Sequence, residues 1–146
     1  MPPAPIVVLD TNAVLDMLLF RDPSGAALYT AITAGTVCWQ ATPSMRGELQ
    51  HLLTRADFRA WGVTAEQLWQ GWDRHCAQVE PGLAAVRHGL RCTDADDQKF
   101  IDFAVDCGAR WLVTRDRAVL KLARRLRAHR VIATRPAAWS LDHAAI

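Results

Sequence analysis

The chain lacks the features that would place it outside ordinary globular proteins. No apolar run approaches the roughly 18 residues needed to span a membrane. The opening MPPAPIVVLD has no positively charged region before its apolar run, so we expect neither a signal peptide nor membrane attachment. Hydrophobic residues make up 51% and charged residues 22% of the 146 residues, which is typical of one soluble domain spanning 1–146.

The sequence is also poor in cysteine pairs and in several catalytic signatures. None of its four cysteines forms a C-x-x-C pair, so the spacing does not favour zinc, and free thiols suit a reducing cytoplasm. The five histidines share no ligand spacing, and we assign them surface or interface roles. No P-loop, H-E-x-x-H, G-x-S-x-G or Rossmann glycine pattern occurs.

What the chain does contain is a regular alternation of apolar and amphipathic segments. The patterns predict strands at 6–9, 36–40, 76–79, 110–114 and 130–133. They predict helices at 13–20, 25–34, 43–54, 65–75, 96–107 and 116–128, and a short one from Pro136. Residues 83–93 give no clear pattern. Strands that alternate with helices indicate an α/β fold with a parallel sheet of about five strands, covered on both faces.

Acidic residues occur where strands lead into helices. Asp10 and Asp116 follow apolar runs, Asp97 lies in the first turn of a helix, and Glu48 borders the apolar face of another. Ligands bind such sheets beyond the carboxyl ends of the strands. Because gathered carboxylates repel one another, their convergence would require a cation, and carboxylate oxygens suit Mg²⁺ or Mn²⁺. Taken singly, each acid also has a structural explanation, as a helix cap or a solvated side chain.

A strongly basic segment follows these acids. Residues 110–135 hold nine basic residues and one acid, although the whole chain has a net charge of only +2. A basic segment beside an acidic site suits a polyanion held near bound metal. A solvated helix face would explain the same charges.

Four blocks together resemble the PIN domain family, in particular small stand-alone bacterial PIN proteins of toxin–antitoxin systems. The blocks are VVLDTNAVLD, PSMRGEL, CTDADDQKFIDFA and LVTRDRAVL, in the family's order and spacing. The resemblance covers nearly the whole chain and implies a three-layer α/β/α sandwich. It also implies a metal-dependent ribonuclease that cleaves single-stranded RNA.

The resemblance implies roles for individual residues as well. Asp10, Glu48, Asp97 and Asp116 would be the catalytic acids and would hold Mg²⁺ or Mn²⁺. The supporting polar residues would be Thr11, Asn12, Asp94, Asp96 and Thr114. The basic segment offers Arg115, Arg117, Lys121, Arg124 and Arg125 as candidates to bind RNA. An antitoxin protein is an expected partner if the chain is a toxin, and Trp-rich helices could supply a homodimer interface.

Three other functions compete with this hypothesis. A non-catalytic RNA-binding or protein-docking module could keep the fold, although the complete acid set argues against it. A phosphatase with Asp10 as nucleophile needs a second acid two residues later, where Asn12 stands. A phosphoaspartate receiver needs two adjacent acids after the first strand, which are absent. The six tryptophans could stack on bases, but packing in the core or against a second subunit is favoured.

Overall fold

The computed structural model of the chain describes residues 3–55, 60, 62–82 and 88–142. Trp61 and residues 83–87, the latter within the stretch without a sequence pattern, lie outside this part. In the described residues no helix is long and apolar enough to cross a membrane.

Five short strands form one sheet in the order β3-β2-β1-β4-β5, and every pairing is parallel. The strands are β1 (Ile6–Leu9), β2 (Cys38–Ala41), β3 (Cys76–Gln78), β4 (Trp111–Val113) and β5 (Ile132–Thr134). This confirms the predicted α/β class, strand number and strand direction. β2 begins two residues later than predicted, because the N–H groups of Thr36 and Val37 bond back to the carbonyl of Ala31. β5 also begins late, because Arg130 has φ 65 and Val131 bonds back to Leu126.

Seven α-helices lie between and beside the described strands. They are α1 (Thr11–Leu18), α2 (Ala26–Thr33), α3 (Pro43–Arg55), α4 (Ala65–His75), α5 (Gln98–Asp106), α6 (Arg117–Leu120) and α7 (Ala123–Ala128). The 3₁₀ turns are η1 (Pro23–Gly25), η3 (Ala95–Asp97) and η4 (Pro136–Ala138). The helix predicted over 65–75 is confirmed, together with the reciprocal cap between Thr64 and Gln67.

The single basic helix predicted over 116–128 is wrong. The chain leaves helical geometry at Leu122, with φ −91 and ψ 3, and forms α6 and α7 instead. Val119, Leu122 and Leu126 are buried on both sides of this break, and the intervening basic residues are exposed. The helix predicted over 13–20 begins earlier, at Thr11, because Asp10 is its N-cap. The terminal helix from Pro136 is a 3₁₀ turn.

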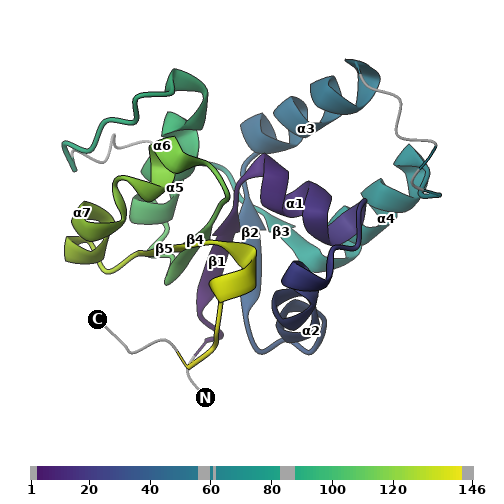
Figure 1. Cartoon of the computed structure of the whole chain (residues 1–146), viewed down its shortest axis with the longest axis horizontal. Helices are drawn as coiled ribbons and strands as arrows, with labels where there is room; N and C mark the ends of the chain where they lie inside the picture. Colours follow the sequence, from purple (N-terminus) through teal and green to yellow (C-terminus); the bar gives the residue numbers. More distant parts are fainter. Residues whose placement is uncertain (1–2, 56–59, 61, 83–87, 143–146) are drawn as a thin grey trace.

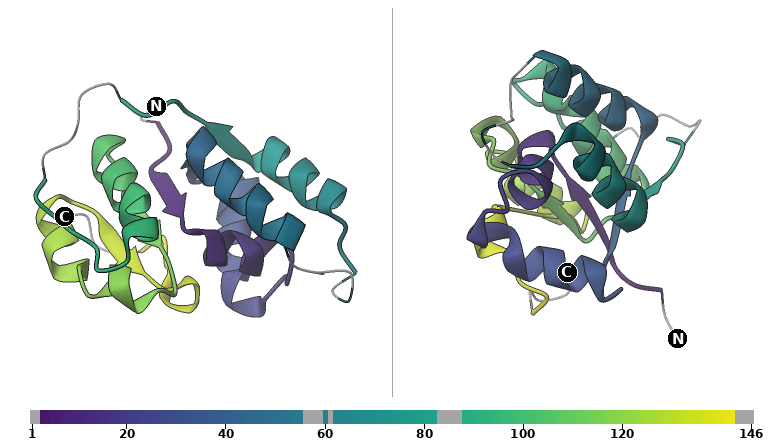
Figure 2. Two further views of the ribbon diagram at one scale, coloured as in Figure 1. Left: turned by 90° about the horizontal axis from the view of Figure 1, so that it is seen from above. Right: turned by 90° about the vertical axis from the view of Figure 1, so that its right-hand side faces the viewer.

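The elements form a three-layer α/β/α sandwich. Figure 1 shows the sheet in the middle, α5, α6 and α7 beside β4 and β5, and α1 to α4 around the other strands. The further views in Figure 2 show helices on both sides of the strands. The sheet forms the centre of the core, where Val7, Val8, Leu112 and Val113 are fully buried.

Four tryptophans belong to this core. Trp39, Trp72, Trp111 and Trp139 are all buried, and their rings make edge contacts in the pairs Trp39–Trp72 and Trp111–Trp139. Such contacts contribute about 0.5–1.5 kcal/mol beyond burial. The prediction that tryptophans pack in the core is therefore confirmed for these four.

Candidate active site

The strand order creates a switch point between β1 and β4. From β1 the chain proceeds outward to β2 and β3, and it then returns to the other side of β1 to form β4. Successive connections that leave in opposite directions open a crevice beyond the carboxyl ends of the two strands. Asp10 directly follows β1, and Asp116 follows β4 by three residues. The sheet therefore brings together two acids that are far apart in sequence.

Asp10 is held firmly at this edge. Asp10 is buried, with only 2% of its surface exposed. Oδ1 accepts the Asn12 N–H at 2.7 Å, which caps α1, and Oδ2 accepts the Thr114 hydroxyl at 2.5 Å. Burial raises the pKa of this carboxyl, while the bonds from Thr114 and Asn12 partly oppose the rise.

Thr114 links Asp10 to the second acid. This threonine is fully buried, and its hydroxyl oxygen also accepts the Asp116 N–H at 2.9 Å. Asp116 in turn caps α6, since its Oδ1 accepts the Ala118 N–H at 2.8 Å. One threonine thus fixes the side chain of Asp10 and the backbone of Asp116 in a single chain of hydrogen bonds.

Asp97 comes from η3 and completes a three-carboxylate cluster. Carboxylate oxygens of Asp10, Asp97 and Asp116 all lie within 4.8 Å of one another. Burial raises the pKa of Asp97 to about 8, and a hydrogen bond and charge repulsion from Asp116 add to the rise. The same hydrogen bond lowers the pKa of Asp116, although burial opposes this. Of the two carboxyls, Asp97 is therefore the one that more readily holds a proton.

The three aspartates fit a divalent cation. The Oδ2 atom of Asp97 is buried and has no hydrogen-bond partner, and such an atom is costly unless a ligand satisfies it. Carboxylate oxygens are the hard donors that Mg²⁺ and Mn²⁺ prefer. In the part of the chain that the structure describes, this is the one cluster with a metal-ligand arrangement.

Glu48 lies beside the cluster and does not belong to it. Its Oε2 accepts the Thr11 hydroxyl at 2.7 Å, and its Oε1 lies 3.0 Å from the Lys99 ammonium. Thr11 is thus a hydrogen-bond partner of Glu48, the fourth acid expected from the sequence. Glu48 shares one cavity of about 370 Å³ with Asp10 and Asp97. Its lining consists of Asp10, Thr11, Asn12, Glu48, His51, Leu52, Arg55, Asp94, Asp96 and Asp97.

Two further acids, Asp94 and Asp96, lie in this region, and Asp94 caps a helical turn. The Oδ1 atom of Asp94 accepts the Asp96 N–H at 3.0 Å and begins η3. Asp94 and Asp96 are exposed at the cavity wall. Asn12 contributes its backbone N–H to Asp10, and its exposed side chain lines the same wall.

The basic residues named from the sequence fall into two groups. Arg117, Lys121, Arg124 and Arg125 are exposed on α6 and at the start of α7, so their charges are available to a ligand. Arg115 instead forms a two-point ion pair with Asp16 of α1, at 2.7 Å and 3.1 Å. Asp16 is buried, and Arg115 therefore ties the loop before Asp116 to α1.

Several interactions near Asp97 were not predicted from the sequence. The surface role expected for the histidines is wrong for His88, whose side chain is 1% exposed and lies 2.7 Å from Asp102. His88 Nδ1 accepts the Leu90 N–H, and Gln98 bonds the backbone on both sides of Arg91, at Leu90 and Cys92. These contacts hold the segment before η3 against α5. The polar pattern of 88–98 gave no sequence signal for them.

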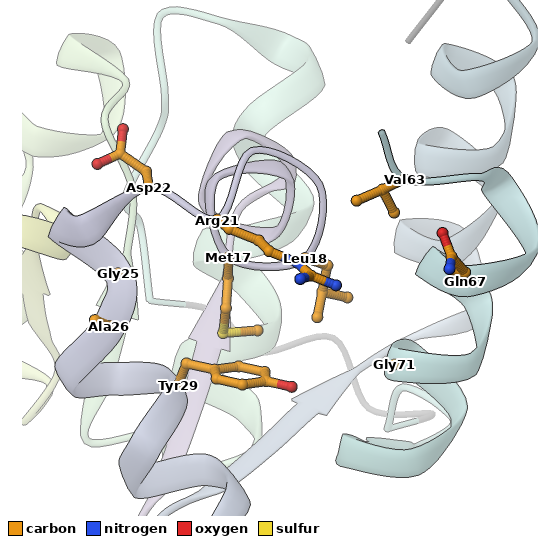
Figure 3. Close-up of a pocket in the computed structure, with 10 residues that line it drawn as sticks. All are labelled: Met17, Leu18, Arg21, Asp22, Gly25, Ala26, Tyr29, Val63, Gln67 and Gly71. Atoms are coloured by element: carbon orange, nitrogen blue, oxygen red, sulfur yellow. The ribbon is translucent and has the colours of Figure 1, made fainter. Parts of the chain in front are cut away.

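A second cavity lies between α1, α2 and α4 and shares no lining residue with the acidic one. It also measures about 370 Å³. Figure 3 shows Met17 and Leu18 of α1 near the ring of Tyr29, with Val63 and Gln67 across the gap. At one side the helices approach closely, since a Cβ on Gly71 would lie 3.2 Å from Leu18 Cδ2. No acid of the cluster reaches this cavity.

Fold and site together define a class: an α/β sandwich with a carboxylate cluster suited to a divalent cation at its switch point. The family model described as PIN domain matches residues 6–118. The chain therefore belongs to the PIN domain family, whose members are generally nucleases, and the resemblance seen in the sequence is confirmed.

A solved structure shows the same fold. The chain is similar to VapBC2 from Rickettsia felis, solved bound to a DNA fragment from their promoter. The TM-score is 0.61 and the identity 16%, over 89% of this chain and 98% of that one. At this identity the likeness shows the fold alone. No curated protein matches the sequence.

Proposed function

We propose that this protein is a Mg²⁺- or Mn²⁺-dependent endoribonuclease that cleaves single-stranded RNA. The observation that carries the proposal is the convergence of Asp10, Asp97 and Asp116, from three separate elements, within 4.8 Å. The unpartnered buried oxygen of Asp97 supports it further. Membership of a nuclease family makes phosphodiester hydrolysis the chemistry to test first.

The three aspartates would hold the cation, which would supply Lewis-acid activation of water and charge stabilisation at phosphorus. The chain's own groups prepare the site. Thr114 and the N–H of Asn12 fix both oxygens of Asp10, and the N–H of Ala118 fixes one oxygen of Asp116. Because the pKa of Asp97 is about 8, its carboxyl holds a proton at neutral pH, and ligation requires that this proton leave.

The exposed basic residues of α6 and α7 would hold the RNA backbone. Arg117 directly follows Asp116 and begins α6, and Lys121 is the C-cap of the same short helix, so both are close in sequence to the acid site. Hydrolysis by water with departure of the 3′-oxygen would leave a 5′-phosphate on the product.

The test is cleavage of an unstructured RNA with Mn²⁺ and with EDTA, using wild type, Asp10→Asn and the control Asp142→Asn. Asp142 is an exposed aspartate outside the cavity. We expect cleavage by wild type and by the control with Mn²⁺ only, and none by Asp10→Asn. If wild type binds RNA but never cuts it, the alternative of a non-catalytic RNA-binding module replaces the nuclease. Cleavage by Asp10→Asn at the wild-type rate would remove the site assignment.

We further propose that an antitoxin-type protein partner controls the activity. The support is the similarity to the VapBC2 complex. Production of the chain alone should arrest growth of a bacterial host, and co-production of the product of the adjacent reading frame should restore it. An Asp10→Asn chain should not arrest growth, and arrest by that variant would separate toxicity from the acid site.

A further inference from the structure

Lys99 occupies a position beside the acid site that the proposed reaction does not yet explain. It lies in the first turn of α5, and the sequence contains one other lysine, Lys121. Its Nζ atom is 3.0 Å from Glu48 Oε1 and 2.6 Å from the carbonyl oxygen of Asp96. The side chains of Lys99 and Glu48 are 28% and 32% exposed, so solvent only partly screens the ion pair.

These contacts engage both oxygens of Glu48. The Thr11 hydroxyl donates to Oε2 at 2.7 Å, and Lys99 donates to Oε1. Asp10, Asp97 and Asp116 form a compact group from which Glu48 is separate. A second divalent ion near the first needs carboxylate oxygens of its own, as two-metal sites hold their ions about 4 Å apart. Three other carboxylates line this cavity: Asp94 and Asp96 are exposed, whereas Glu48 is half-buried. An ammonium already binds Glu48.

We infer that Lys99 is a resident cation in place of a second metal ion, so that the site holds one divalent ion on three aspartates. This inference rests on the proposed metal-dependent function and specifies its stoichiometry. Lys99 is then a positioning residue, because it holds Glu48 through its ammonium and connects α3 to η3, the turn that carries Asp97. The assignment also removes Glu48 from the metal ligands expected from the sequence.

Repulsion by the ammonium of Lys99 supports the assignment. A second divalent ion bound to Glu48 would have to lie next to the ammonium, and two cations this close together near a protein surface repel each other. Removal of Lys99 would end this repulsion and free Glu48 Oε1 for a metal.

The experiment counts Mn²⁺ ions bound to the full chain, by calorimetric titration and by the electron paramagnetic resonance signal of free Mn²⁺. We expect one ion for wild type, Lys121→Met and Lys99→Arg, and two for Lys99→Met. Glu48→Gln should still bind one ion with an affinity within about threefold of wild type, whereas Asp97→Asn should lose it. Thermal melting establishes that each variant is folded.

The outcomes separate this inference from the function on which it rests. Two ions on wild type, or loss of the ion in Glu48→Gln, would overturn the role of Lys99 and leave a metal site in place. A folded Lys99→Met chain that still binds one ion would overturn it as well. If Lys99→Met does not fold, wild type and Glu48→Gln decide. No Mn²⁺ binding by wild type would refute the metal-dependent function itself.

Discussion

The replacement Asp97→Asn should stabilise the metal-free protein at neutral pH. The pKa of Asp97 is about 8 against an ordinary value of 3.8, because burial and the carboxyls of Asp116 and Asp10 disfavour its charge. The folded state therefore binds a proton more tightly than the unfolded state does. It follows that this group weakens stability progressively as the pH rises from about 4 to about 8. Asparagine has a similar shape and no charge to ionise.

The magnitude follows from linkage. At pH 7 the full shift would correspond to about 4 kcal/mol. Asp97 is partly exposed, so solvent screening reduces this to about 1–2 kcal/mol. For a chain of this length such a gain raises the melting temperature by roughly 3–6 °C. The gain should shrink as the pH falls toward 4 and should vanish only below the ordinary value of 3.8, where wild-type Asp97 is protonated in both states.

The assay is thermal and urea unfolding in EDTA between pH 4 and pH 8, with Asp96→Asn as the matched control. Asp96 is the exposed neighbour in the same turn, and its replacement should change stability by less than about 0.5 kcal/mol. Added Mn²⁺ should stabilise wild type by about 2.7 kcal/mol at 100 times its dissociation constant, and should not stabilise Asp97→Asn. A destabilised Asp97→Asn, or a pH-independent difference, would show that Asp97 is structural and would refute the reasoning.

Two other perturbations test the surroundings of the site. Arg115→Gln should destabilise the protein by about 2–3 kcal/mol, because it would leave the buried Asp16 carboxylate without its cation. A double-mutant cycle with Asp16→Asn should give a coupling of about 1–2 kcal/mol, and zero coupling would mean that the ion pair does not stabilise the loop. Exchange of Arg124 and Arg125 for glutamine should reduce the salt dependence of RNA binding by about 1.4 in log–log slope. Arg74→Gln, an exposed change on α4, should leave that slope unchanged, and equal slopes for all three proteins would place RNA elsewhere.

The parts of the fold that depend on local sequence were predictable. A continuous apolar run such as Ile6–Leu9 is buried on both faces in a parallel sheet, and it appears as the central strand β1. Thr64 and Gln67 formed their reciprocal cap because both partners lie within one helical turn. The position of Asp10 and Asp116 after adjacent strands followed from the same rules.

The unpredicted parts depend on contacts between residues distant in sequence. Arg115 pairs with Asp16 across 99 positions, and Lys99 pairs with Glu48 across 51. In the sequence Arg115 and Lys99 resemble ordinary solvated residues, and no pattern indicates which acid each of them pairs with. The break at Leu122 was missed because Val119, Leu122 and Leu126 keep the spacing of one continuous helix face, so the apolar pattern does not indicate it.

The arrangement of donors around the acids explains how the metal-free chain tolerates the cluster. Hydrogen bonds to a carboxylate lower the free energy of its charged form. Asp10 receives donors on both oxygens and Asp116 receives one, but Asp97 has a buried oxygen with none. The fold thus compensates two of the three acids with its own N–H and hydroxyl groups, and Asp97 compensates by holding a proton. A cation that binds this cluster needs to displace only that proton, so its affinity should rise with pH up to about 8 and then level off. A Mn²⁺ affinity that is constant between pH 6 and pH 8 would show that binding displaces no proton from Asp97, and would refute this account.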